Sequence, residues 1–366
     1  MLSKDEVGMM KDEGGPHGAA TVPETQIAEA KRMGIMSEAV GFKNQGLQGT
    51  EATPDALVCR GLGRAFGRKW AVQDLSFSVP RGAVCGFLGL NGAGKTTALR
   101  MAYGLLAPTE GSVLVAGMDP ARVPLALRRK VGYVIDSPNF YEWLTVRETL
   151  AFVGHHRAPE WDDAYAQRLL DLFGVPADQT IRTLSKGQRA KVSLILGLGF
   201  HPELLLLDEP TLGLDPVARR QFVEGVLGEF AGDGRTVIIS SHQITEIAGL
   251  VDHVVVIHEG RLITSEPSET LLARVVRLRL GFGDQAPPPR PDSAVWRGSG
   301  LVHWSVSGHE VEAVLTQYQE KELNDLTTAI AAQRVQVEAL GLEEAFVHLV
   351  GGWQGSDARA STGGER

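Results

Sequence analysis

The chain has 366 residues, 43% of them hydrophobic, and carries a formal net charge of −8 at pH 7. This length allows one large core or two modest ones, and the acidic balance argues against a nucleic-acid partner, which usually meets a basic surface. No apolar run approaches the roughly 18 residues of a membrane helix, and residues 1–15 lack the apolar stretch of a secretory signal. We therefore expect a cytosolic protein. Cys85 lies in an apolar strand pattern and is interpreted as a small buried hydrophobe, not as half of a disulfide.

Composition divides the chain into an extension and a main domain. Residues 1–53 are rich in Gly, Glu, Lys and Gln and show no sustained period, so we predict a disordered extension. Residues 54–276 alternate apolar strands with helical patterns, which predicts a mostly parallel sheet covered by helices.

The remaining residues predict a second, smaller domain. Residues 277–352 contain the run APPPRP, which predicts a stiff loop inside a small α+β accessory domain. Strand-like patterns lie near residues 302–306 and 335–340, and a helical pattern lies near residues 317–332. Residues 353–366 are predicted to be a disordered tail.

The segment GLNGAGKTT fits the phosphate-loop pattern G-x-x-x-x-G-K-[ST]. Its glycines can take positive φ and lack a Cβ that would collide with phosphate oxygens. Backbone N–H groups at the start of the following helix, with the Lys95 ammonium, would hold ATP, and the Thr96 hydroxyl would bind Mg²⁺. An apolar strand at residues 83–88 and a helix at residues 96–105 complete the motif. The predicted nucleotide-binding residues are Gly89, Leu90, Asn91, Gly92, Ala93, Gly94, Lys95, Thr96 and Thr97.

A pair of carboxylates follows a buried strand in LLLLDEP. Four leucines at residues 204–207 are typical of a strand covered on both faces of a parallel sheet. Asp208 and Glu209 then stand at its carboxyl end, the edge where α/β sheets bind ligands. We predict that Asp208 binds Mg²⁺ and that Glu209 is the general base for the attacking water. The alternative is an exposed acidic turn.

Between these two sites, LSKGQ at residues 184–188 resembles the LSGGQ signature of ABC ATPases, and the resemblance covers about residues 56–263. It extends to GLD at residues 213–215, to His242 in IISSH and to Phe66 in RAFG. It implies the ABC type of phosphate-loop ATPase, with an α/β core, an antiparallel β subdomain and a helical subdomain near residues 140–185.

The same resemblance implies how the site residues act. Phe66 would stack on adenine, Asp215 would belong to the D-loop, and His242 would hold the γ-phosphate and the attacking water as a catalytic residue beside Lys95 and Glu209.

In the ABC family two copies pair head to tail, so that each ATP lies between one copy's phosphate loop and the other's signature. Ser185, Gly187 and Gln188 would therefore contact the nucleotide of a second copy or of a homologous ATPase subunit. Hydrolysis by the pair would drive a separate membrane permease. The chain would then lie peripherally on the cytoplasmic face of the cell membrane.

Two residues depart from the family pattern. Asp136 stands where the family has the Q-loop glutamine, and we predict that it ligates Mg²⁺; the alternative is a solvated loop residue. Lys186 replaces the first central glycine of the signature. It is interpreted as a solvent-facing residue at a helix start, and the alternative is a cation near the γ-phosphate.

Three aromatic residues, Phe140, Tyr141 and Trp143, precede a capping box formed by Thr145 and Glu148. Such a cluster can be core or a docking surface. In ABC transporters this region meets the membrane subunit, which favours docking.

The ending at residues 335–352 is similar to that of ABC ATPases that serve exporters of drugs, peptides, lipids or ions through separate permeases. The alternative for this ending is a generic amphipathic helix. An importer subunit is the rival inside the family. Ribosomal members typically carry two phosphate loops and DNA-repair members a long coiled coil, and neither pattern is found here. A subunit without turnover is disfavoured by Glu209 and His242.

Overall fold

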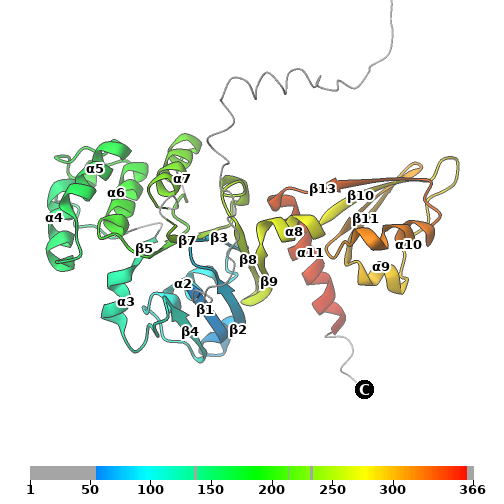
Figure 1. The fold of residues 1–366 in the computed structure, drawn as a ribbon, viewed down its shortest axis with the longest axis horizontal. Helices are drawn as coiled ribbons and strands as arrows, with labels where there is room; N and C mark the ends of the chain where they lie inside the picture. The colour runs from blue at the N-terminus through cyan, green and yellow to red at the C-terminus, as the bar shows by residue number, and fades with distance from the viewer. Residues whose placement is uncertain (1–54, 136–137, 213, 231–233, 361–366) are drawn as a thin grey trace, which may run out of the picture. The chain divides into compact units, whose positions relative to one another are not determined.

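The computed structural model describes residues 55–135, 138–212, 214–230 and 234–360. The predictions for residues 1–53, for Asp136 and for Gly213 lie outside the described residues, as does the end of the tail. Three sheets and their covering helices make up the described part (Figure 1). No helix in the described ranges is both long and apolar enough to cross a membrane.

The largest sheet has six strands in the order β5-β6-β7-β3-β8-β9. The first five run parallel, and β9 is antiparallel to β8. Every residue of β3, β6, β7 and β8 is buried, because this sheet is covered on both faces. The strands are β3 (Val84–Leu88), β5 (Val131–Ile135), β6 (Leu204–Asp208), β7 (Thr236–Ser241), β8 (His253–His258) and β9 (Arg261–Pro267).

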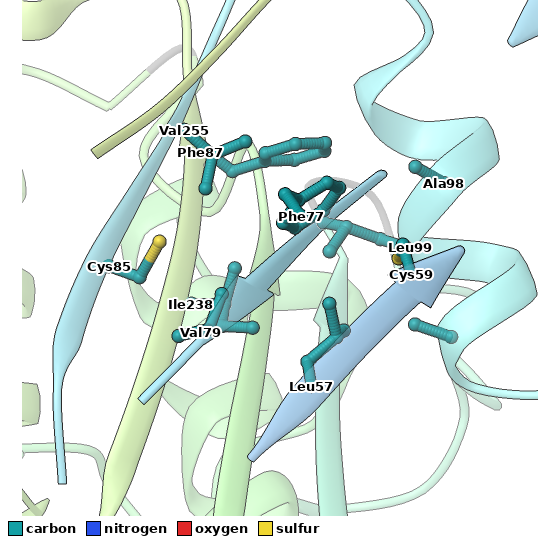
Figure 2. A pocket seen from close by; sticks show the side chains of 11 residues that line it. Leu57, Cys59, Phe77, Val79, Cys85, Phe87, Ala98, Leu99, Ile238 and Val255 are labelled. Carbon is teal, nitrogen blue, oxygen red and sulfur yellow. The ribbon is translucent and has the colours of Figure 1, made fainter. Parts of the chain in front are cut away.

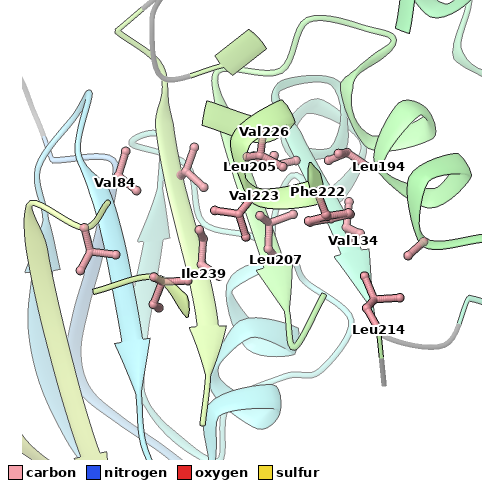
Figure 3. Packing of buried hydrophobic residues seen from close by; sticks show 14 of the residues in the cluster. Val84, Val134, Leu194, Leu205, Leu207, Leu214, Phe222, Val223, Val226 and Ile239 are labelled. Atoms are coloured by element: carbon pink, nitrogen blue, oxygen red, sulfur yellow. The ribbon is translucent and has the colours of Figure 1, made fainter. Parts of the chain in front are cut away.

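Successive residues of the central strands point to opposite faces and so enter different cores. Leu205 and Leu207 belong to a cluster with residues of the helices, and Leu204 and Leu206 belong to a second cluster on the other face. Figure 3 shows Leu205 and Leu207 beside Phe222 on the first face. Replacement of such a fully buried leucine by alanine typically costs about 2–5 kcal/mol.

Helices cover the first face. They are α4 (Val146–Arg157), α5 (Asp163–Phe173), α6 (Lys186–Leu198) and α7 (Pro216–Phe230), with the 3₁₀ turns η1 (Ile181–Thr183) and η3 (Ile244–Glu246). The expected capping box begins α4: Glu148 N–H donates to Thr145 Oγ1 at 3.1 Å, and Thr145 N–H donates to Glu148 Oε2 at 2.8 Å. This N–H holds the pKa of the Glu148 carboxyl below its usual value.

An antiparallel sheet in the order β2-β1-β4 packs on the second face together with α2 and α3. Gly111 has a φ of 71° and lies against β1, where a Cβ would meet the Gly61 carbonyl oxygen at 2.0 Å. Only glycine fits this approach. The elements are β1 (Leu57–Phe66), β2 (Lys69–Val79), β4 (Glu110–Val115), α2 (Lys95–Ala102) and α3 (Pro124–Lys130).

The C-terminal sheet has the order β11-β12-β10-β13, with a small core around the buried Trp296. The two expected strands are present as β11 and β13. Two further strands, β12 and β10, lie between them in the sheet. Their apolar alternation is too short to have predicted them separately. In place of the single helix expected at residues 317–332, the structure has the 3₁₀ turn η4 followed by the short helix α10. The elements are α8 (Ser268–Arg274), β10 (Val276–Gly281), α9 (Ala294–Gly298), β11 (Leu301–Ser307), β12 (Glu310–Leu315), η4 (Glu320–Glu322), α10 (Leu323–Thr328), β13 (Arg334–Ala339) and α11 (Leu342–Ala360).

Helix α11 is assigned through Ala360, so it includes residues 353–360 of the segment for which the sequence predicts a disordered tail. Gly351 and Gly352 resemble a helix end in the sequence, yet both lie inside the helix. A glycine inside a helix costs only about 1 kcal/mol relative to alanine, which the packing of α11 offsets.

Both cysteines are free and buried, and they line one small apolar space between the six-stranded sheet and the antiparallel sheet β2-β1-β4 (Figure 2). Burial raises the pKa of the Cys59 thiol to about 12. Burial, with the nearby Asp252 charge, raises the pKa of the Cys85 thiol even further. Neither thiol is therefore ionised near neutral pH.

We predict that Ellman's reagent at pH 8 labels neither cysteine of the folded protein, because the thiolate is the reactive form. Both thiols should react within minutes in a denaturing concentration of guanidinium chloride. The release of thionitrobenzoate measures this reaction. Prompt labelling of one thiol in the native protein would contradict the burial described for that cysteine.

Candidate active site

The phosphate loop connects β3 to α2. Gly92 and Gly94 have φ angles of 81° and 103°, in the region that favours glycine. A Cβ on Gly94 would lie 2.5 Å from the Ala71 carbonyl oxygen, and one on Gly89 would lie 2.7 Å from that of Ile257. The curvature of the loop is therefore fixed both by its glycines and by the backbone of β2 and β8 that lies against them.

Lys95 is 5% exposed, and its ammonium lies among oxygen atoms. It donates to the carbonyl oxygens of Gly89 at 2.8 Å and Leu90 at 3.3 Å, and it pairs with Glu209 Oε1 at 3.0 Å. A buried cation needs such partners, because its desolvation is otherwise costly. The fold brings Lys95 and Glu209, which lie far apart in the chain, into contact.

Asp208 is buried at the end of β6 and accepts three hydroxyl hydrogen bonds. Thr96 Oγ1 and Ser240 Oγ donate to Oδ1 at 3.0 Å each, and the Tyr133 hydroxyl donates to Oδ2 at 3.1 Å. Burial, followed by the Asp208 charge, raises the pKa of Tyr133. A hydroxyl and a carboxylate oxygen so close together are the hard ligands that Mg²⁺ prefers.

Glu209 follows Asp208 with a φ of 48°, a backbone region that costs energy for a residue with a side chain. Its N–H donates to Ser240 Oγ at 2.9 Å, which anchors the turn to β7. Its Oε2 lies 2.8 Å from Nδ1 of His242, and its Oε1 lies beside Lys95. The structure therefore joins the three residues that the sequence predicts to be catalytic.

A second network, which the sequence did not reveal, lies beyond these residues. Thr211 Oγ1 donates to Glu246 Oε2 at 3.1 Å, and the Arg219 guanidinium pairs with Glu246 Oε1. Arg219 also donates to the Leu214 carbonyl oxygen at 3.0 Å. Glu246 thus ties the segment after His242 to the segment after Glu209. Thr211, Arg219 and Glu246 are dispersed over 36 positions and form no sequence motif. The network could therefore not be predicted from the sequence.

The signature residues lie at the start of α6, in the group formed with α4 and α5 (Figure 1). Ser185 N–H donates to Gln188 Oε1 at 2.9 Å, and Gln188 N–H donates to Ser185 Oγ at 3.2 Å. Lys186 is exposed, as its interpretation as a solvent-facing residue requires. These bonds cap the N-terminus of α6, and neither of them joins the signature to the phosphate loop of the same chain.

Phe66 ends β1 and is 53% exposed, and the Arg64 guanidinium carbon lies 4.9 Å from the centre of its ring. Lys69, its cross-strand partner, lines a pocket together with residues of the phosphate loop. A base stacked on Phe66 would lie near this pocket. Asp215 accepts from Val217 N–H at 3.0 Å and so begins α7.

The family model described as "ABC transporter" matches residues 72–212. The bacitracin transport ATP-binding protein of Bacillus licheniformis is 32% identical over 80% of this chain and 96% of its own length. A daunorubicin resistance ATP-binding protein of Streptomyces coeruleorubidus is 36% identical over 81% and 96%. The linearmycin resistance ATP-binding protein of Bacillus subtilis is 29% identical over 81% and 98%.

A solved structure of an ATP-binding subunit of an ABC transporter superposes with a TM-score of 0.55, at 28% identity over 60% of this chain and 92% of that one. The chain belongs to the family of ABC transporter ATP-binding proteins, which bind and hydrolyse ATP. The expected phosphate-loop fold and ATPase class are thereby confirmed.

We predict that Glu246→Gln lowers the free energy of unfolding by about 2 kcal/mol, because Arg219 loses a charged partner in a mostly buried position. Urea denaturation measures the change. Asp178→Asn is the matched control, since it removes the Arg147–Asp178 pair, in which both side chains are exposed. Equal midpoints for the two variants would show that the Glu246 network adds no more stability than the exposed Arg147–Asp178 pair.

Proposed function

We propose that the chain is the ATPase subunit of an exporter, that two copies pair head to tail around two ATP molecules, and that hydrolysis drives a separate membrane permease. The observation that carries the catalytic part is the position of the Glu209 carboxylate, held by Lys95 and by His242 at the carboxyl ends of β6 and β7. A base, a cation and an imidazole meet there at hydrogen-bonding distances.

In the proposed mechanism the N–H groups at the start of α2 and the Lys95 ammonium bind the phosphates of ATP. Glu209 accepts a proton from the attacking water, and His242 orients the γ-phosphate through its ring. Thr96 and Asp208 would hold Mg²⁺, which when bound neutralises charge developing on the phosphates. The same role for Asp136 is a separate proposal, tested by the Mg²⁺ dependence of an Asp136→Ala variant.

The proposed pairing is supported by the signature residues. Ser185 and Gly187 lie at the N-terminus of α6, a helix of 13 residues whose first N–H groups can serve an anion. In a head-to-tail pair they would face the ATP bound to the other copy.

A permease contact is supported by an exposed aromatic patch, which we define as Tyr141, Trp143 and Phe152. Their side chains are 51%, 71% and 45% exposed, and the Tyr141 ring contacts both of the others, with its centroid 5.1 Å from that of Trp143 and 5.6 Å from that of Phe152. Phe140 instead packs against the core. A groove between α3 and α4 includes Phe152 and is also lined by Arg128, Arg129, Arg157 and Glu160. We propose that a cytoplasmic helix of the permease with an acidic residue docks there.

Export is supported by the relatives named for bacitracin transport and for daunorubicin and linearmycin resistance, whose matches extend over almost their whole lengths. We propose that the cargo is a drug, peptide, lipid or ion, the classes that the sequence resemblance implies.

We predict that Glu209→Gln lowers the rate of ATP hydrolysis by roughly 10²- to 10⁴-fold, because the water loses its base. Binding of ATP should persist, since the phosphate loop is unchanged. Phosphate release and equilibrium binding of a fluorescent ATP analogue measure the two quantities. A variant that hydrolyses ATP at the parental rate would remove Glu209 from the mechanism.

We predict that Tyr141→Ala with Trp143→Ala uncouples the ATPase from its permease. Basal hydrolysis by the purified subunit should stay within about twofold of the parent, because both side chains are exposed. Recovery of the subunit with membranes that contain the permease should fall. Leu172→Ala, an equally exposed apolar residue on α5, is the control. Unchanged membrane recovery of the double variant would exclude this patch as the docking surface.

A further inference from the structure

Helix α11 packs against the segment that follows the catalytic histidine. It contacts η3, which begins two residues after His242, and also α8, β9 and β11. Leu342, Phe346 and Leu349 of α11 are buried in the same cluster as Ile244 of η3. The last helix of the chain is therefore part of the hydrophobic core that supports one wall of the nucleotide site.

A second contact places α11 near the phosphate loop. Trp353 meets His258 edge to face, with ring centroids 5.0 Å apart and an interplanar angle of 81°. His258 is the last residue of β8 and is 4% exposed. It lines a pocket with Leu90, Asn91, Gly92 and Ala93, which form the middle of the phosphate loop. An aromatic pair of this geometry favours one fixed ring orientation.

The turn after His258 transmits this contact to the loop backbone. Gly260 N–H donates to the Ala93 carbonyl oxygen at 3.0 Å, and Gln73 N–H donates to the Gly260 carbonyl oxygen at 2.8 Å. Glu259 and Gly260 both have positive φ, with angles of 46° and 78°, so the turn has a defined shape. A shift of His258 would therefore move the backbone that supports Ala93.

Gly352 allows the close approach of α11 that this contact requires. A Cβ at Gly352 would lie 2.3 Å from Val302 Cγ1 of β11, whereas a Cβ at Gly351 would meet nothing within 4 Å. The two adjacent helical glycines thus differ in the space beside them. The pair provides a way to displace the end of α11 without altering Trp353.

We propose that α11 positions the phosphate loop, with Trp353 as the positioning residue that acts through His258 and the following turn. The inference rests on ATP binding at residues 89–97, and it requires neither the proposed pairing nor export. Because coupling is reciprocal, ATP binding must also stabilise the packing of α11. The C-terminal domain is thereby linked to the nucleotide state of the ATPase core.

The test measures binding of MgATP to the full-length chain by calorimetry. Trp353→Ala should weaken binding roughly two- to tenfold, the range that one aromatic pair supplies, and Trp353→Phe should retain most of the affinity. Gly352→Ala should weaken binding in the same direction, and Gly351→Ala should bind like the parent. Hydrogen exchange of residues 342–353 should slow when MgATP is added to the parent and should slow less in Trp353→Ala.

Each outcome decides one question. Parental affinity in both Trp353→Ala and Gly352→Ala would overturn the positioning role. If Trp353→Ala fails to fold, the comparison of Gly352→Ala with Gly351→Ala decides the role alone, and equal affinities there would overturn it. Absence of MgATP binding by the parent would contradict the proposed nucleotide site itself, which is a different failure.

Discussion

The parallel pairing of β6, β7 and β3 is the constraint on which the rest of the site depends. Asp208 lies opposite Ser240, and Leu88 lies opposite Ser241, so that the three strands end at one edge of the sheet. A shift of one residue would exchange the two faces of a strand and move its buried side chains to the wrong core. The two hydrophobic clusters therefore fix the register, and the register brings the polar residues together.

The polar residues at this edge stabilise one another at some cost. Lys95 is almost fully buried, and Glu209 has a positive φ angle, two features that are unfavourable in isolation. The ammonium is compensated by a carboxylate and two carbonyl oxygens, and the turn at Glu209 is anchored by Ser240. Such strain is found where the surrounding structure determines a geometry that function needs, and here it aims a carboxylate at the phosphate loop.

The site is supported from several directions by elements distant in the sequence. Glu246 joins the segments after Glu209 and after His242, and the turn after β8 supports the phosphate loop. Through η3 and His258 the C-terminal helix reaches both regions. The ATPase core and the C-terminal domain are thus parts of one packed structure, even though the phosphate loop and carboxylates alone define the chemical class.

The sequence by itself predicted the class of fold, the phosphate loop and the carboxylates after β6, because these follow from local rules. Glycines at fixed spacing before Lys95 specify a phosphate loop, and four leucines before Asp208 specify a buried strand that ends at a ligand-binding edge. The capping box at Thr145 is likewise a local pattern. The Glu246 network, the continuation of α11 beyond Gly352 and its contact with His258 were decided only by tertiary structure. These features depend on which side chains from distant segments face one another and on the space beside a glycine. Neither can be read from the spacing of residues in the sequence.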